Sequence, residues 1–467
     1  MDIIETLSRI NRWWVSGRVD ENFLYPAVRL EFQKIIALLD QERILSIVGP
    51  RRSGKSVLLT GTIDYLLKQG VPKERILFFS GDDPALFSGK VTIGDVLEKY
   101  ANDVIHENLN ELTHKIYVFI DEIHTLVDWQ VWLKSYYDRR LSIKFIVSGS
   151  SATHLFQGSK ESLLGRIESI HILPLSFRQF CHFWSVYKRE PRLMEFMELL
   201  PEGSVFSDPT KYYHTLDQNR WKWEPFQPFI NGILKEYLLV GGYPEYFTTP
   251  HLALWQKRLI DDIIGQGLYR DIISVYHIKN PERLENLLFF VAANTGQDFN
   301  YKTIADTLGC DNETVSGYLS FLEQAYLVII NRCYAPNVGK SIRKNKKLYV
   351  YDHGIANAML HYNVIDSARE GMMIENCCLR DALQVADENR WSIGYYREAG
   401  TEIDIIIDKK TSLLPIEVKF RSMLDYIPAM DIFQARFKQY KVVNGLVITK
   451  DTFGLKGNLC LIPYWLI

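Results

Sequence analysis

The stretch Gly49–Ser56 reads GPRRSGKS and fits the pattern G-x-x-x-x-G-K-[ST]. It lies in the context that this pattern needs, because the apolar run 44–48 predicts a buried strand before it and residues 57–67 predict a helix after it. In such a loop the glycines let backbone N–H groups surround phosphates, and the start of the helix adds its positive dipole. The sequence therefore predicts a site for a nucleoside triphosphate.

A second motif follows at residues 116–122, which read IYVFIDE. Its apolar half predicts another buried strand, and this strand ends in the carboxylates of Asp121 and Glu122. The first carboxylate would hold Mg²⁺, and the second would orient and deprotonate the attacking water. The pair therefore favours hydrolysis over binding alone. His124, two residues further on, is expected to pack or to make a simple hydrogen bond.

A third apolar run, at residues 145–147, predicts a strand that leads into the serine-rich segment 148–151. One of these polar side chains is expected to sense the γ-phosphate, and the sequence does not say which serine. In the loop, Lys55 is expected to reach the β- and γ-phosphates and Ser56 to ligate Mg²⁺. The residues expected to contact ATP and its Mg²⁺ are Gly49, Pro50, Arg51, Arg52, Ser53, Gly54, Lys55, Ser56, Val57, Asp121 and Ser148.

The composition of the chain limits the alternatives. Its 467 residues allow about three domains of roughly 150 residues each. The net charge is −2, so a nucleic-acid surface has to be local. The six cysteines have no C-x-x-C or metal-binding spacing, and neither a signal peptide nor a long apolar run is present. We therefore expect a cytoplasmic protein without membrane contact and without zinc.

The pattern along the chain predicts four parts. Alternating strands and helices indicate a parallel α/β core in residues 1–175. The helical stretch 176–280 is expected to form a lid on that core. Its aromatic segment 212–229 could stack on bases or on a partner, but a place in the core of the lid is favoured. The remaining parts are residues 281–352 and 353–467.

The third part predicts a winged helix. Helices are expected at 284–293, 301–308 and 312–324, and two strands follow at 326–331 and 348–351. A basic loop between the strands would neutralise DNA phosphates, and a solvated hairpin on a protein-binding fold is the alternative. The five cations of this loop are Lys340, Arg343, Lys344, Lys346 and Lys347.

The last part contains acidic residues and a lysine on successive strands, which are expected within residues 393–419. Alternation places Glu417 and Lys419 on one face of their strand, and Asp404 on the neighbouring strand can join them. Glu375, on a preceding helix, could supply another carboxylate. Carboxylates suit a hard divalent ion, and the lysine can hold the attacking water or charge on a phosphate. Such residues are also common at exposed strand ends, so this pattern alone is weak.

Taken together, these motifs resemble those of a prokaryotic AAA+-type ATPase family, abundant in archaea, whose members carry a winged helix and a restriction-endonuclease-like fold at the C-terminus. The resemblance covers nearly the whole chain. It implies an α/β multidomain protein with a P-loop AAA+-type parallel sheet core, a helical lid, a winged helix and a PD-(D/E)xK nuclease-like domain. The motifs that carry it are Gly49–Ser56, Asp82-Asp83, Tyr117–Glu122 with Trp129, Ser148–Ser151, Leu164-Gly165-Arg166, Pro174–Phe177, Gly241–Pro244, Tyr351-Asp352, Glu375-Asn376, Glu402–Asp404 and Ile416–Lys419.

The resemblance also implies a homo-oligomer, most simply a hexamer-like ring. In such a ring Arg166, before the last core strand, would complete the active site of the neighbouring subunit, whereas Arg139 and Arg140 are weaker candidates. Whether the nuclease-like domain cuts DNA stays open, and Ile403 stands where the family usually has proline.

We therefore expect a Mg²⁺-dependent, oligomeric ATPase that engages DNA through its C-terminal half. Three classes of function compete: an enzyme that acts on DNA, an ATP-gated DNA-binding module, and a protein-interaction switch without nucleic acid. The expected catalytic residues are Glu122, Lys55 and Arg166 for ATP hydrolysis and Asp404, Glu417 and Lys419 for cleavage. The expected metal ligands are Ser56, Asp121, Asp404, Glu417 and Glu375.

Overall fold

The computed structural model describes residues 3–87, 91–149, 163–273, 278–335, 344–421, 427–438, 440–442 and 444–467. By their contacts the residues form two compact units, Met1–Leu173 and Pro174–Ile467. We call them unit 1 and unit 2 and describe each by itself. The division falls close to residue 175, where the sequence pattern changes from alternating strands and helices to helices.

Unit 1 is built on a parallel β-sheet. In the described residues this sheet has five strands in the order β2-β3-β4-β1-β5, and every neighbouring pair is parallel. The apolar runs of the sequence supply these strands, because a parallel sheet covered on both faces buries nearly every strand residue. The predicted parallel core is confirmed. The strands are β1 (Ile44–Val48), β2 (Ile76–Ser80), β3 (Ile116–Asp121), β4 (Ile143–Gly149) and β5 (Ile167–His171).

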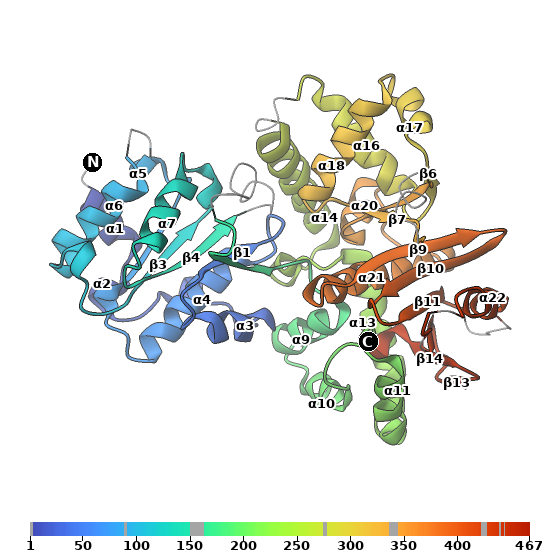
Figure 1. Ribbon diagram of the computed structural model, residues 1–467. Coiled ribbons are helices and arrows are strands. Elements are labelled where there is room, and N and C mark those ends of the chain that lie inside the picture. The colour runs from blue at the N-terminus through green and yellow to red at the C-terminus, as the bar shows by residue number, and fades with distance from the viewer. Residues whose placement is uncertain are drawn as a thin grey trace. The chain divides into compact units, whose positions relative to one another are not determined.

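Helices cover both faces of this sheet (Figure 1). Side chains alternate along a strand, so Val118 of β3 joins one apolar core with Leu133, whereas Phe119 joins the opposite core with Leu59. The helices on the first face are α1 (Ile3–Ile10), α6 (Ile93–Tyr100) and α7 (Trp129–Asp138), and those on the second are α3 (Glu31–Leu38) and α4 (Lys55–Lys68). Unit 1 also contains the short helices α2 (Trp13–Ser16) and α5 (Pro84–Phe87).

The first helices of unit 2 pack on elements near the end of the chain. Tyr212 Oη donates to the carbonyl oxygen of Leu466 at 2.7 Å, and the ring centroids of Trp223 and Trp465 lie 5.7 Å apart. These helices belong to unit 2 by their contacts, and their role as a lid on the nucleotide core stays a prediction. Trp221, in the same aromatic segment, is exposed. The helices are α9 (Phe177–Tyr187), α10 (Pro191–Leu199), α11 (Pro209–Gln218), α12 (Arg220–Trp223), α13 (Gln227–Val240) and α14 (Leu252–Ile260), followed by a π-helix (Asp261–Ile273).

Three helices and an antiparallel sheet of three strands come next. Two of the helices begin at a side-chain cap: Asn300 accepts from the N–H of Thr303 at 2.9 Å, and Asp311 accepts from the N–H of Thr314 at 2.7 Å. Gly309, with φ 61°, ends the first of these helices in a left-handed turn. The elements in chain order are α16 (Pro281–Ala293), β6 (Asp298–Phe299), α17 (Tyr301–Leu308), α18 (Asn312–Gln324), β7 (Val328–Arg332) and β8 (Lys346–Val350), and the sheet order is β6-β8-β7.

The last part of unit 2 is a mixed sheet whose described strands have the order β13-β14-β12-β11-β10-β9. Strands β9, β10 and β11 are antiparallel, whereas β11, β12 and β14 run parallel. The helix α21 contacts β9, β10 and β11, and α22 packs through Phe433 on a core that includes Tyr396 and Ile406 (Figure 1). The strands predicted within 393–419 are confirmed. The elements are α20 (His353–Met359), α21 (Ser367–Glu388), β9 (Ser392–Glu398), β10 (Thr401–Asp408), β11 (Leu413–Lys419), α22 (Pro428–Arg436), β12 (Gly445–Thr449), β13 (Gly454–Lys456) and β14 (Leu459–Pro463).

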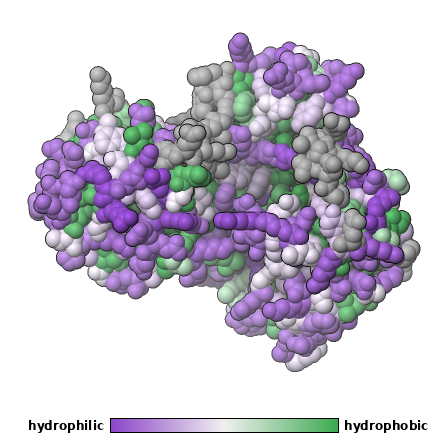
Figure 2. Space-filling view, in the orientation of Figure 1, coloured by the Kyte–Doolittle hydropathy of each residue, from purple (hydrophilic) through white to green (hydrophobic). Residues whose placement is uncertain are grey.

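The surface gives no direct pointer to a site. Figure 2 shows a largely hydrophilic face on which apolar residues are scattered singly or in small groups. Exposed apolar side chains such as Val15, Val127 and Trp221 come from different elements of the chain. Single exposed apolar residues are common on protein surfaces and do not mark a binding site. The candidate sites are therefore sought among polar and charged groups.

A buried carboxylate joins distant segments of unit 2. Asp352 is fully buried; its Oδ2 accepts from the N–H of Gly242 at 2.8 Å and its Oδ1 from the N–H of Gly354 at 2.9 Å. Arg380 lies 3.7 Å from the same carboxylate, and its Nη2 donates to the carbonyl oxygen of Leu175 at 3.3 Å. We call these five residues the Asp352 junction. They link the first residues of unit 2 to α20 and α21.

The close approach of backbone at this junction predicts the effect of one methyl group. A Cβ on Gly354 would lie 2.5 Å from the carbonyl oxygen of Val240 and 2.7 Å from the Cα of Gly241. We therefore expect Gly354→Ala to lower the free energy of unfolding of unit 2 by about 1–3 kcal/mol, seen by calorimetry as an earlier transition of that unit. The matched control is Gly371→Ala in α21, where a Cβ would meet no atom within 4 Å. The control variant should raise the free energy of unfolding of unit 2 by about 0.5–1 kcal/mol. Equal destabilisation by both changes would contradict the role of the junction.

Candidate nucleotide site and carboxylate cluster

Two glycines shape the loop Gly49–Ser56, which joins β1 to α4. Gly54 has φ 93° and ψ 21°, a left-handed conformation that favours glycine. At Gly49 a Cβ would lie 2.1 Å from the carbonyl oxygen of Ile172, whose own N–H donates to Val48 at 2.7 Å. The loop therefore needs glycine at both positions, once for conformation and once for space.

Lys55 is held inside this loop. Its Nζ donates to the carbonyl oxygens of Gly49 at 3.1 Å and Pro50 at 2.9 Å, and the residue is buried. The ammonium group thus stays within the turn that is expected to hold phosphates. Because α4 begins at this residue, the N–H groups of its first turn, which an α-helix leaves without an intrahelical partner, lie in the same place.

Two oxygen donors from different elements meet beside the loop. Ser56, in the first turn of α4, donates from Oγ to Asp121 Oδ2 at 2.6 Å, and Asp121 is the last residue of β3. A hydroxyl and a carboxylate are hard oxygen ligands, so the pair fits Mg²⁺. The predicted metal ligands Ser56 and Asp121 are therefore together in the structure.

Ser148 also contacts the carboxylate of Asp121. It lies on β4, the strand between β1 and β3, and opposite Ile47 in the parallel register. Its hydroxyl donates to Asp121 Oδ1 and accepts from the N–H of Glu122, the latter at 3.1 Å. Sequence reasoning missed these contacts, although the strand order places the hydroxyl there. Contact with a γ-phosphate stays a prediction, and Ser150 and Ser151 lie outside the described residues.

Several contacts position Glu122. Its backbone is left-handed, with φ 47° and ψ 43°, a conformation that is uncommon outside glycine. Its carbonyl oxygen accepts from Thr125 Oγ1 at 2.8 Å. Its carboxylate Oε2 lies 3.3 Å from His124 Nδ1, and both side chains are largely buried. The candidate base therefore projects from a turn held by its neighbours, and His124 lies beside its carboxylate.

Arg166 directly precedes β5 and forms a bidentate pair with Asp138 at the end of α7. Its Nε donates to Oδ1 at 2.7 Å and its Nη2 donates to Oδ2 at 3.2 Å. The hydrogen bond from Arg166 lowers the pKa of the Asp138 carboxyl. The guanidinium is thus oriented within its own subunit, and its role in a neighbouring subunit stays a prediction.

A second polar site lies in unit 2, where β10 and β11 bring the predicted residues together. The N–H of Asp404 donates to Glu417 Oε2 at 3.3 Å, and the N–H of Val418 donates to Asp404 Oδ2 at 2.8 Å. Lys419 Nζ lies 2.5 Å from Glu417 Oε1. The alternation expected on this strand is therefore confirmed. We call Glu375, Glu402, Asp404 and Glu417 the carboxylate cluster.

Burial shifts the pKa values in the carboxylate cluster. Desolvation, followed by the charge of Asp404, raises the pKa of Glu417 to about 7 and raises the pKa of Glu375 above its usual range. Burial opposes the charged form of Lys419, but Glu417 and Asp404 outweigh it and raise the pKa of its ammonium group. Both effects mean that the cluster favours positive charge in its neighbourhood.

Lys347 supplies such a charge, and this corrects its prediction as a DNA contact. It lies on β8 rather than in a loop, its side chain is 6% exposed, and its Nζ is 2.7 Å from Glu402 Oε1 and 3.5 Å from Glu375 Oε1. Tyr349, two residues along the strand and on the same face, donates to Glu375 Oε1 at 2.6 Å. A buried lysine with two carboxylate partners does not reach DNA.

The other predicted cations also have partners or fall outside the description. Lys346 also belongs to β8, not to the predicted loop; its Nζ lies 3.3 Å from Tyr301 Oη and 4.5 Å from the centroid of that ring. Lys344 Nζ donates to the carbonyl oxygen of Arg397 at 3.1 Å. Lys340 and Arg343 lie outside the described residues.

The predicted metal set of Glu375, Asp404 and Glu417 is only partly formed. Within the part of the chain that the structure describes, no group of three or more His, Cys, Asp or Glu side chains is placed to hold a metal ion. Glu375 has Lys347 and Tyr349 as its partners instead. This leaves Asp404 and Glu417 as the pair of carboxylates beside Lys419.

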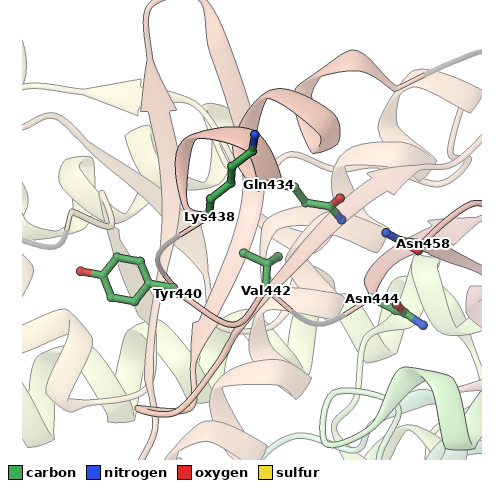
Figure 3. Close-up of a pocket in the computed structure, with 6 residues that line it drawn as sticks. All are labelled: Gln434, Lys438, Tyr440, Val442, Asn444 and Asn458. Atoms are coloured by element: carbon green, nitrogen blue, oxygen red, sulfur yellow. The ribbon is translucent and has the colours of Figure 1, made fainter.

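A polar pocket of about 210 Å³ lies at α22 and the strands beyond it. Figure 3 shows Gln434, Asn444 and Asn458 gathered in this region, while Tyr440 points away from them. The pocket contains none of the predicted site residues. Separately, none of the described helices is long and apolar enough to cross a membrane.

Comparison with known families identifies part of the chain. Residues 41–181 match the model described as an AAA domain. Residues 231–365 and 370–467 match two further models, each described as a domain of unknown function. The AAA match covers the Gly49–Ser56 loop and all five strands of the parallel sheet. Residues 41–181 are therefore similar to AAA domains, and the parallel sheet and loop of unit 1 fit a P-loop α/β fold.

Similar proteins match most of the chain at low identity. An uncharacterized protein of Haemophilus influenzae is 27% identical over 401 residues, which cover 83% of this chain and 85% of that protein. The uncharacterized protein MJ1637 of Methanocaldococcus jannaschii is 24% identical over 450 residues, covering 95% and 88%. The structure of the Walker-type ATPase PABY2304 of Pyrococcus abyssi matches with a TM-score of 0.45 and 16% identity, over 72% of this chain and 99% of that one.

The contacts of Ser148 predict that it acts through Asp121 and Glu122. Ser148→Ala should lower Mg²⁺-dependent ATP turnover by about 10–100-fold, because groups that orient a metal ligand have effects of this size. Binding of a fluorescent ATP analogue should change little. Ser46→Ala is the control: this serine is also fully buried on a core strand, and its hydroxyl has no hydrogen-bond partner among the described residues. Equal loss of turnover in both variants would show a general packing effect instead.

Proposed function

We propose that unit 1 hydrolyses ATP with the help of Mg²⁺, and that this reaction drives the engagement of DNA by unit 2. The observation that carries the first half is the contact between Ser56 and Asp121, at 2.6 Å, with Glu122 as the next residue. It brings together oxygen ligands for a metal and a carboxylate for water, at the mouth of a loop that holds an ammonium group.

Each residue of this site has a role in the proposed reaction. The N–H groups of the loop and the ammonium of Lys55 would bind the β- and γ-phosphates. Glu122 would orient water for attack in line with the leaving oxygen and accept its proton. Ser56 and Asp121 would hold Mg²⁺, which when bound offsets charge on the phosphates. Ser148 would keep Asp121 and the backbone of Glu122 in place.

Assembly belongs to the same proposal. Arg166 would supply its guanidinium to the ATP bound by a neighbouring subunit in a homo-oligomer, most simply a hexamer-like ring. The bidentate pair with Asp138 supports this, because an arginine held at the end of a core helix has a defined direction. An arginine acting on transferred phosphate changes turnover by about 10³–10⁵-fold in related reactions.

The division of roles between Lys55 and Glu122 predicts two different defects. Lys55→Ala should lose ATP affinity, because it removes the charge inside the loop. Glu122→Gln should bind ATP and stall, with turnover reduced by about 10²–10⁴-fold, because it keeps the shape of the side chain and removes the base. ATP binding and phosphate release measure the two effects. Glu42→Gln, at an exposed residue of unit 1, is the control. Wild-type turnover by Glu122→Gln would contradict the assignment.

A second activity is supported by Asp404, Glu417 and Lys419. Two carboxylates on adjacent strands with an ammonium 2.5 Å from one of them are suited to a single divalent ion and a phosphodiester. The order α16, β6, α17, α18, β7, β8 matches that of a winged helix, which supports a nucleic-acid surface next to this site. We therefore propose a DNA phosphodiester as the ligand of unit 2.

One observation favours an alternative. The helix α18, which would be the recognition helix, carries glutamates and no lysine or arginine, and Lys347 is taken up by the carboxylate cluster. Neither α18 nor Lys347 therefore supplies a cation for phosphate contacts. An ATP-gated switch that binds DNA without cutting it, or that binds a protein through this surface, is the second candidate.

Nicking of plasmid DNA in the presence of Mg²⁺ or Mn²⁺ separates these candidates. If unit 2 cleaves DNA, Asp404→Ala and Lys419→Ala should each abolish nicking, because one loses a metal ligand and the other a charge beside the phosphate. ATP hydrolysis should persist in both. Lys456→Ala, at an exposed residue of β13, is the control for loss of positive charge. Nicking that is the same in all three variants would favour the switch.

A further inference from the structure

Lys347 occupies a fixed place in the carboxylate cluster. Its strand, β8, is the central one of its sheet, and Lys347 has Asp298 of β6 and Asn331 of β7 as its backbone partners. Hydrogen bonding on both sides fixes the backbone from which the side chain projects. The ammonium group is therefore a permanent part of the cluster.

The carboxylates around Lys347 already have cationic partners within the chain. Glu402 accepts from Arg397 Nε at 2.7 Å, besides its contact of 2.7 Å with Lys347. Glu375 has Lys347 at 3.5 Å and the hydroxyl of Tyr349 at 2.6 Å. The ring of Tyr395 also lies beside the ammonium group, with its centroid 5.5 Å from Lys347 Nζ. Both glutamates are therefore ion-pair partners of Lys347.

We propose that Lys347 is the built-in cation of the carboxylate cluster, so that the cluster accepts one divalent ion, held by Asp404 and Glu417, and not two. Glu375 and Glu402 are then counter-ions of the lysine and not metal ligands. This inference rests on the proposed phosphodiester site for the ion at Asp404 and Glu417. The role of Lys347 itself rests on geometry alone.

The physical reason is the cost of buried charge. A carboxylate taken out of water without a cation is strongly unfavourable, and removal of one partner of a buried pair leaves the other uncompensated. An ammonium group on a fixed strand compensates the charge of the carboxylates and, unlike a bound ion, cannot dissociate. It also repels a second divalent ion in the same space, because like charges at a few ångströms repel strongly in a buried site.

The test removes the charge and keeps the volume. Lys347→Met should lower the melting temperature in EDTA by on the order of 5 °C. Mn²⁺ should restore it, because an ion can now take the place of the ammonium group. The double variant Lys347→Met/Glu375→Gln, which also removes the carboxylate charge, should melt higher than Lys347→Met in EDTA and respond less to Mn²⁺. If Lys347→Met does not fold in EDTA, the double variant carries the comparison.

A count of bound ions and a matched control variant complete the test. In an Asp121→Ala background, which removes a metal ligand of the nucleotide site, the number of bound Mn²⁺ ions from electron paramagnetic resonance should rise from one to two when Lys347 is changed to Met. Lys346→Met is the matched control, because Lys346 is the neighbouring residue of β8 and lies over Tyr301 instead. It should change neither the melting temperature nor the count of ions.

The outcomes distinguish this inference from the proposed function. Two Mn²⁺ ions in the Asp121→Ala protein that retains Lys347, or a melting temperature unaffected by Lys347→Met, would overturn the role of the lysine. If the parent protein binds no Mn²⁺ at Asp404 and Glu417, the phosphodiester site fails, and the one-ion inference fails with it. In that case rescue of Lys347→Met by Glu375→Gln still shows that the lysine is the counter-charge of the cluster.

Discussion

A charged side chain that leaves water needs a partner inside the protein, since an uncompensated buried ion costs several kcal/mol. This constraint explains the polar sites described above. In unit 1 it places Lys55 on the carbonyl oxygens of its own loop and Asp121 between two serine hydroxyls. In unit 2 it places Asp352 on two backbone N–H groups and Lys347 between two glutamates.

The two sites meet this constraint in different ways. In the nucleotide site the hydrogen bonds of Lys55 and Asp121 described above go to neutral carbonyl and hydroxyl groups. In the carboxylate cluster the partners are themselves charged, and most of the charge is compensated within the chain. The first site is therefore suited to a highly charged ligand, whereas the second is suited to the single divalent ion proposed above.

Local pattern predicted the nucleotide site and the strands of the carboxylate cluster, because glycine spacing, apolar runs and alternation act over a few residues. Local pattern did not predict the carboxylate partners of Lys347. The residues next to a lysine in a charged stretch do not show whether its side chain faces solvent or a glutamate that is distant in the sequence. The contacts of Ser148 escaped for a related reason, since they depend on the strand order β3-β4-β1. Likewise, the contact of Tyr212 with Leu466 joins residues 254 positions apart in the sequence, which a local pattern does not reveal.

The contact between Gly49 and Ile172 lies within unit 1, close to its last residue. Ile172 lies against the first residue of the nucleotide loop, and Leu175 is already bound at the Asp352 junction through Gly242 and Arg380. Three residues of chain span at most about 10 Å, and proline at position 174 restricts one of their torsion angles. Residues 172–175 are therefore held at both ends, by Val48 at one end and by the Asp352 junction at the other.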